Sequence, residues 1–152
     1  MEIDKPRDTG ATPFLIACES GHADIAKLLL FDERTNVNAS GTNGRTPLWQ
    51  ASQNGHLMIV KLILATDKKI NTSTRDTAHG LTALDQAKIS THAPQIQWEQ
   101  PEDVLRRHQN GPEIVRLLTE YEENPLNVRQ QLQKEINYYG FFFKKKIELM
   151  RK

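Results

Sequence analysis

The sequence predicts an all-α solenoid of stacked helix-turn-helix units joined by short β-turn or hairpin fingers. The segment TPLWQASQNGHLMIVKLIL, residues 46–64, closely matches TPFLIACESGHADIAKLLL, residues 12–30, when Thr46 is placed on Thr12. Each copy opens with Thr-Pro and has Gly-His in its middle. Apolar residues then recur at i, i+3 and i+4, which indicates one buried stripe along a helix. A period of about 33 residues with this order is typical of helix pairs stacked side by side.

The first helix of each copy is defined by its end residues. Thr12 and Thr46 are suited to cap a helix N-terminus, and the proline after each fits the first helical turn, where a missing N–H costs nothing. Gly21 and Gly55 can take the left-handed backbone that ends a short helix. A third, fainter copy starts at HGLTALDQAK, where Thr82 takes the place of Thr46, and ends at NGPEIVRLLTEY.

The second helix of each copy carries the apolar stripe, formed by Ile25, Leu28 and Leu29 in one copy and by Ile59, Leu62 and Ile63 in the next. One helix pair cannot hide this stripe, whereas the next pair stacked against it can, so each copy supplies the core of the other. The predicted helices therefore span residues 13–20, 24–31, 47–54, 57–65, 83–90 and 112–123.

Over residues 8–123 these motifs resemble the ankyrin-repeat family. We expect an array over residues 1–124, with repeats at about 8–41, 42–77 and 78–124, followed by a C-terminal helix and basic tail over 125–152. The resemblance implies a non-catalytic module that binds a partner protein through its concave face and finger tips. Carried onto this sequence, the implied contact residues are Thr9, Ala11, Glu19, Ser20, Asn43, Arg45, Gln53, Asn54, His79 and Leu81, with Ile89 and Ser90 in the third repeat.

The third copy departs from the pattern by an insertion at about 91–110, between its two helices. We expect a loop followed by a short helical piece, because Pro94 and Pro101 break helices and PEDVLRRHQ runs from acidic to basic. One interpretation is a tolerated surface insertion, since long loops cost little entropy. The other is a specificity lid with Trp98 as a partner-binding anchor. Trp49 likewise has two interpretations, a partner contact or packing between repeats.

Composition limits the other functions. No run of about 18 apolar residues is present, so no membrane span is predicted. The N-terminus lacks the apolar centre of a secretory signal and Cys18 is the single cysteine, so we expect an intracellular monomer, either cytoplasmic or nuclear. Residues 125–152 carry a net charge of +5 and residues 1–124 carry −4. An acidic body disfavours nucleic acid as the partner.

No catalytic, cofactor or metal site is predicted. Cys18 falls where the family has a small buried residue, which favours packing over nucleophilic chemistry. The histidines lack the paired cysteines or second histidines at helical spacing that zinc needs. GTNGRT has neither the lysine nor the spacing of a phosphate loop.

The tail and the N-terminus leave alternatives open. Leu126, Leu132 and Ile136 predict a further helix that caps the last repeat. YYGFFFKKK combines aromatics with lysines, as in segments that contact a membrane surface, although a frayed terminus is the simpler interpretation. Met1 lies just ahead of the first repeat with no polar capping repeat before it. The alternative hypothesis is therefore a structural piece of a longer ankyrin-repeat protein whose effector domain is missing.

Overall fold

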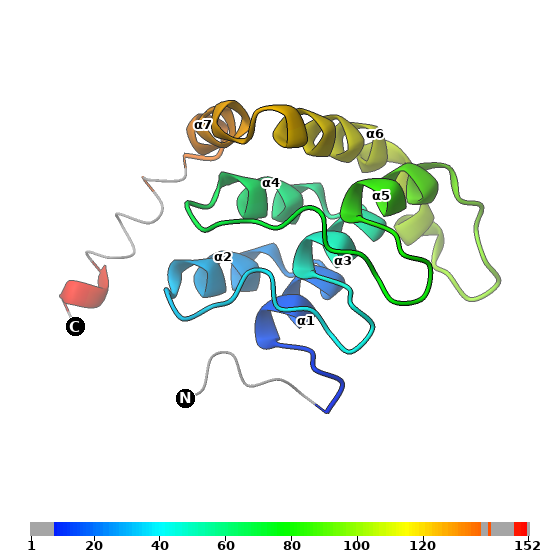
Figure 1. Cartoon of the computed structure of the whole chain (residues 1–152), viewed down its shortest axis with the longest axis horizontal. Coiled ribbons are helices and arrows are strands. Elements are labelled where there is room, and N and C mark those ends of the chain that lie inside the picture. The colour runs from blue at the N-terminus through cyan, green and yellow to red at the C-terminus, as the bar shows by residue number, and fades with distance from the viewer. Residues whose placement is uncertain (1–7, 138–139, 141–147, 152) are drawn as a thin grey trace.

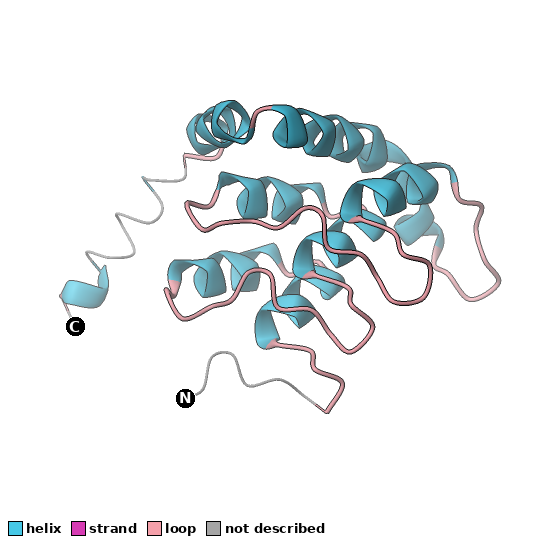
Figure 2. Ribbon diagram, viewed as in Figure 1, coloured by secondary structure: helices cyan, strands magenta, loops and turns pink. Residues whose placement is uncertain are grey.

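The computed structural model describes residues 8–137, 140 and 148–151, which form two layers of stacked helices (Figure 1). The helices α1, α3 and α5 follow one another in the first layer, α2 and α4 form the second, and α6 and α7 lie end to end across the top of the view. No strand occurs among these residues (Figure 2), which agrees with the predicted all-α class. The bounds are α1 Pro13–Ser20, α2 Ala23–Phe31, α3 Pro47–Gln53, α4 Leu57–Ala65, α5 Ala83–His92, α6 Pro101–Glu123 and α7 Pro125–Glu135.

The first-layer helices begin as predicted. The Thr12 hydroxyl accepts a hydrogen bond from the Leu15 N–H at 3.2 Å, and the Thr46 hydroxyl accepts one from the Trp49 N–H at 3.1 Å. Thr82 caps α5 in the same way. Gly21 ends α1 at φ 79°, a left-handed conformation that favours glycine. These local contacts fix where each repeat turns from its finger into its first helix.

The second-layer helices are buried unequally, which corrects one sequence-based expectation. In α4, Leu62 and the two isoleucines of the predicted stripe are all buried at 2% exposure or less. In α2, Ile25 and Leu28 are 49% and 48% exposed, and the buried residues are Ala26 and Leu30. The expectation that Ile25 and Leu28 lie in the core is therefore wrong, because about half of each side chain is exposed.

The fingers are hydrogen-bonded turns that also join each repeat to the next. In the second finger, the Gly44 N–H donates to the Gly41 carbonyl at 3.0 Å. Between fingers, the Thr42 N–H donates to the Thr9 carbonyl at 3.0 Å, and the Thr77 N–H donates to the Asn43 carbonyl at 2.9 Å. The recurrence of this bond keeps successive fingers in a row.

The insertion is mostly helix, which corrects the prediction of a loop with a short helical piece and a separate helix over 112–123. Helix α6 is continuous over 23 residues and contains Pro112, and α5 runs on to His92, so the loop covers only residues 93–100. Gly111 lets α5 and α6 cross closely, because a Cβ there would lie 2.1 Å from Thr91 Oγ1. The insertion thus lengthens both helices of the third repeat.

Helix α7 packs against α4 and α6 and buries Val128 and Leu132, which agrees with a helix that caps the stack. The Gln133 amide donates to the Ala65 carbonyl at 2.8 Å, and Glu135 pairs with Lys61. Most of YYGFFFKKK lies outside the described residues, so the interpretation of that segment as a membrane contact or a frayed terminus stays a prediction.

Candidate functional site

A polar hollow of about 320 Å³ lies where the ends of α1 and α3 meet the insertion. We define the polar hollow by its lining residues, which come from α1, the α3–α4 turn, the 93–100 loop and the start of α6. They are Glu19, Ser20, Asn54, His56, Glu99, Asp103, Arg106 and Arg107. The structure therefore brings together three predicted contact residues, Glu19, Ser20 and Asn54, from two different repeats.

Arg106 joins the insertion to the second repeat. Its Nε donates to the Asn54 carbonyl at 2.9 Å, and its guanidinium pairs with Asp103 at 2.7 Å. A third of the Arg106 side chain and 43% of the Asp103 side chain remain exposed. The pair thus presents a cation and an anion side by side at the surface of the hollow.

Arg107 is the structural residue of the two neighbouring arginines. Its guanidinium forms an ion pair with Glu99 at 2.8 Å and donates to the Ser90 carbonyl at 3.2 Å, with only 9% of the side chain exposed. Its backbone lies on Gly55, where a Cβ would be 2.8 Å from the Arg107 Cα. A buried guanidinium is stable only with such partners, so Arg107 fixes the 93–100 loop against α5.

His56 and Asn54 join the first two repeats at the floor of the hollow. A ring nitrogen of His56 lies 3.1 Å from the Glu19 carbonyl, and the Asn54 amide donates to the same oxygen at 3.0 Å. Burial, and then the charge of Arg106, lower the pKa of His56, so its ring is neutral at pH 7. His56 therefore adds a polar group and no charge to the hollow.

Trp98 stands at the edge of this site, one residue before Glu99. It is 79% exposed, and Ile96 beside it is 52% exposed. The loop around them is held by its own contacts, with the Glu99 N–H donating to the Ile96 carbonyl at 3.0 Å and the Gln95 amide donating to the Glu99 carbonyl at 2.9 Å. The Trp98 side chain is therefore not packed against the stack.

The finger residues divide into exposed tips and structural positions. Thr9, Asn43 and His79 are exposed, whereas Ala11 and Leu81 are half-buried. Leu81 is held on both sides, since its N–H donates to Asp76 at 2.8 Å and its carbonyl accepts from the Trp49 indole at 3.1 Å. Of the predicted finger residues, Thr9, Asn43 and His79 are therefore the exposed tips.

Arg45 and Trp49 pack on each other within the second repeat. The Arg45 guanidinium lies 4.3 Å from the centre of the Trp49 ring, a cation–π contact, and Trp49 is 1% exposed. The packing interpretation of Trp49 is thus confirmed. Arg45 has a structural contact as well as its predicted place on the finger.

The remaining predicted residues lie apart from the hollow. Gln53 is half-buried and does not line it, Ile89 is exposed at 51%, and Ser90 is buried with its carbonyl bonded to Arg107. Sequence reasoning missed four lining residues of the insertion. The one signal for them was the acidic-to-basic order of PEDVLRRHQ, which predicted helix but no site. The four are Glu99, Asp103, Arg106 and Arg107.

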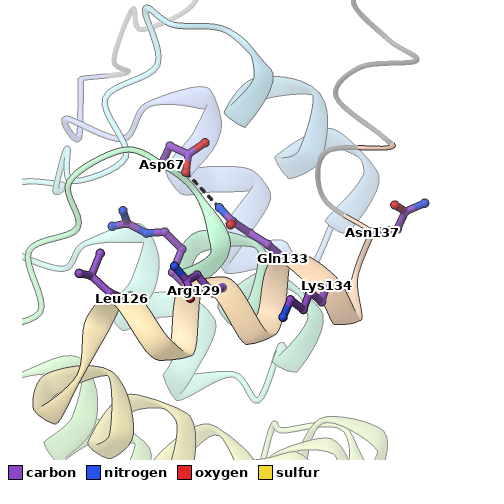
Figure 3. A pocket seen from close by; sticks show the side chains of 7 residues that line it. Asp67, Leu126, Arg129, Gln133, Lys134 and Asn137 are labelled. Carbon is purple, nitrogen blue, oxygen red and sulfur yellow. Dashed lines mark hydrogen bonds between the residues drawn. The ribbon is translucent and has the colours of Figure 1, made fainter.

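A second hollow, of about 620 Å³, lies along α7 (Figure 3). Its floor is tied to the end of α4 by the Gln133 amide, which donates to the Asp67 carboxylate at 3.0 Å. Leu126, Arg129 and Lys134 also line it, and the buried Nε of Arg129 has no hydrogen-bond partner among the described residues. This hollow contains none of the predicted contact residues.

Cys18 lies in the core and not at a surface site. Cys18 is fully buried, and that burial raises the pKa of its thiol, so the thiolate nucleophile is suppressed at neutral pH. Within the described ranges, no three His, Cys, Asp or Glu side chains cluster in a way that could hold a metal ion. No helix in the same ranges is long and apolar enough to span a membrane.

Comparison with known families agrees with this geometry. A model of ankyrin repeats in three copies matches residues 1–76, which is half of the chain. A search of curated proteins finds no match to the sequence. The matched segment includes α1 to α4, the two helix pairs in which the Thr caps, glycine turns and finger bonds recur. The chain therefore belongs to the ankyrin-repeat family.

Proposed function

We propose that this chain is a protein-interaction module without catalysis of its own, and that it binds a partner protein at the polar hollow and the Trp98 loop. Ankyrin repeats are in general protein-interaction modules. The proposal assigns the contact to a particular part of this stack, the junction between the first two repeats and the insertion in the third.

The exposure of Trp98 is the observation that carries the proposal. Large aromatic side chains that become buried on association supply much of the binding free energy in protein interfaces. Trp98 is 79% exposed, and the ion pair between Glu99 and Arg107 holds the loop on which it lies. A loop already held in place loses less conformational entropy when a partner covers it. Trp98 and Ile96 are therefore the proposed apolar anchors.

The polar hollow supports the same proposal by supplying groups that fix orientation. Glu19 and Ser20 are exposed, and the pair Arg106 and Asp103 is partly exposed. An apolar anchor beside hydrogen-bonding groups is the usual anatomy of a protein interface. The exposed finger tips form the other part of the proposed surface, as the family resemblance implies. These tips are Thr9, Asn43 and His79.

The test is affinity capture from the native source with the full chain as bait, compared between the wild type and Trp98→Ala. A matched control is Leu126→Ala, because Leu126 is also strongly exposed, at 65%, but lies on α7. We expect a captured protein to lose about 2 kcal/mol of affinity, roughly thirty-fold, with Trp98→Ala and to be unaffected by Leu126→Ala.

Thermal unfolding of all three chains separates binding from folding, and Trp98→Ala should leave the melting temperature unchanged because the side chain is exposed. Retention of the captured protein at equal affinity by Trp98→Ala would contradict the proposed surface. Capture of no protein by the wild type at micromolar bait concentration would contradict the interaction function itself.

A further inference from the structure

The repeats carry the same apolar pattern but bury it differently. The second helices of the three repeats align by sequence as AKLLL at 26–30, VKLIL at 60–64 and VRLLT at 115–119. In α4 and α6 the residues at the two leading apolar positions are at most 3% exposed, whereas in α2 they are about half exposed. The equivalent residues are Ile25, Ile59 and Ile114 at the first position and Leu28, Leu62 and Leu117 at the second.

The burial of the opposite side of each helix shows toward which neighbouring repeat the side with Ile25 and Leu28 points. In α2, Ala26 and Leu30 are buried, and α2 packs against α4 of the next repeat. In α6, the equivalent residues are Val115, which is half-buried, and Thr119, which is exposed, because no later repeat lies beyond them among the described residues. Positions like Ala26 therefore face the following repeat, and positions like Ile25 face the preceding one. Figure 1 shows α4 above α2 in the view, and below α2 the helix α1 of the same repeat.

A polar contact is unmatched at the same end. His56 reaches back to the Glu19 carbonyl of the repeat before it, and its ring lies on Gly21, where a Cβ would be 2.5 Å away. His22 is the equivalent residue of the first repeat, since both follow the glycine that ends the first helix. It is exposed, and its ring has no hydrogen-bond partner among the described residues. The first repeat therefore carries the histidine of the inter-repeat contact, but no described carbonyl bonds to His22 as the Glu19 carbonyl does to His56.

The opposite end of the stack differs in chemistry. On the outer surface of α6, Arg116 pairs with Glu113 at 2.6 Å and with Glu120 at 2.7 Å, and all three side chains are partly exposed. Terminal repeats with a polar outer face suit contact with water. The α6 end is therefore polar, and the α2 end presents leucine and isoleucine.

We infer that the face of α2 formed by His22, Ile25 and Leu28 is a stacking surface for a further ankyrin helix pair. The occupant is a preceding repeat, carried on a longer polypeptide that contains this chain. Its own second helix presents a small residue and a leucine to Ile25 and Leu28, as Ala26 and Leu30 do to α4. The carbonyl at the end of its first helix meets a ring nitrogen of His22, as the Glu19 carbonyl meets His56.

The first experiment is an immunoblot of the native source with an antibody raised against α7, followed by intact-mass measurement of the captured polypeptide. We expect a species larger than the 17.4 kDa of this chain by at least the mass of one ankyrin repeat. A native polypeptide of 17.4 kDa would overturn the assignment of the occupant to the same polypeptide.

The second experiment tests the face itself by adding a repeat in register. Residues 1–41 are joined to residues 8–152, which duplicates the first repeat, because residue 8 is equivalent to residue 42. We expect the added repeat to unfold with the stack, to raise the denaturant midpoint, and to slow amide exchange in the original α2 by about ten-fold or more. The matched control carries Ile25→Glu and Leu28→Glu in the original copy only, and we expect it to lose these gains.

The same two substitutions in the unextended chain check that the control still folds, since both residues are already half exposed. Independent unfolding of the added repeat, with α2 exchange unchanged, would overturn the stacking surface. Sedimentation equilibrium tests whether a second copy covers the face. If the unextended chain dimerises and Ile25→Glu abolishes the dimer, a second copy is the occupant and the inference is overturned. Neither experiment involves Trp98, so failure here leaves the proposed partner surface untouched.

Discussion

Leu62 in α4 is the position at which truncation most directly tests the stacked core. Its side chain is 2% exposed and belongs to the core between the layers. Leu62→Ala removes the equivalent of three methylene groups, which at about 0.8 kcal/mol each amounts to roughly 2.4 kcal/mol of lost transfer free energy. The unfilled cavity adds to this, so we expect a loss of about 2–5 kcal/mol in the free energy of unfolding.

Leu28→Ala is the matched control, because Leu28 occupies the same place in α2 but is 48% exposed. The same chemical change should cost less than about 1 kcal/mol there, since much of the side chain is already in water. Helix propensity does not separate the two, as both residues lie inside helices and alanine is the best helix former in each.

Equilibrium denaturation in guanidinium chloride, followed by far-UV circular dichroism, measures both changes by linear extrapolation. The slope of the transition should stay constant, since neither variant alters the surface exposed on unfolding by much. A loss for Leu62→Ala below about 0.5 kcal/mol, the size of an ordinary surface substitution, would refute its place in the core. Equal losses at the two positions would refute the open face of α2.

Three further outcomes test other parts of the fold. Gly111→Ala should destabilise the fold by about 1–3 kcal/mol in thermal unfolding, because the added Cβ meets Thr91. This loss should exceed the gain from the better helix propensity of alanine. An unchanged melting temperature would contradict the close crossing of α5 and α6. Cys18 should react with a thiol reagent only in denaturant, since it is fully buried and burial raises its thiol pKa; rapid labelling of the native chain would contradict this. Hydrogen bonds from Arg34 lower the pKa of Asp32 from its ordinary value to about 2, so their contribution is complete above about pH 4 and is lost as the pH falls to 2. Asp32→Asn should remove that small component of acid destabilisation, and an identical acid titration of stability in the variant would contradict it.

The first helix of each repeat could be predicted because its signals are local. A threonine hydroxyl bonds an N–H three residues away, and a glycine at the helix end takes a left-handed conformation within its own turn. The bounds of α1 accordingly agree with the prediction, and those of α3 differ by one residue at one end. Such features require no knowledge of what the repeat packs against.

The exposure of Ile25 could not be predicted from the repeat, because burial depends on the neighbouring repeat. Ile25 and Ile59 occupy the same place in nearly the same sequence, yet only Ile59 has an earlier helix against it among the described residues. A periodic pattern shows which face of a helix is apolar. Whether that face is covered is a property of the stack.

The continuity of helix α6 through Gly111 and Pro112 could not be predicted, because long-range contacts hold its first half. Gly111 and Pro112 are a helix-breaking pair by local propensity, and Pro112 has no N–H for the helical ladder. The first half of α6 is held by other repeats: the Asn110 amide donates to the Gly55 carbonyl at 2.9 Å, and Arg106 donates to the Asn54 carbonyl. Partners this far apart in the sequence leave no local signal.

These same contacts make the insertion one unit with two roles. Loop entropy alone would allow residues 91–109 to be replaced by a short turn at little cost, since a flexible loop loses little when shortened. The insertion is not separate from the stack, however, because Arg107 is buried between Glu99 and Ser90 and lies against Gly55. Removing residues 91–109 would expose the turn between α3 and α4. The anchoring that makes the insertion structural is also what holds Trp98 out in solvent, so the stability of this junction and the proposed binding surface depend on the same ion pair.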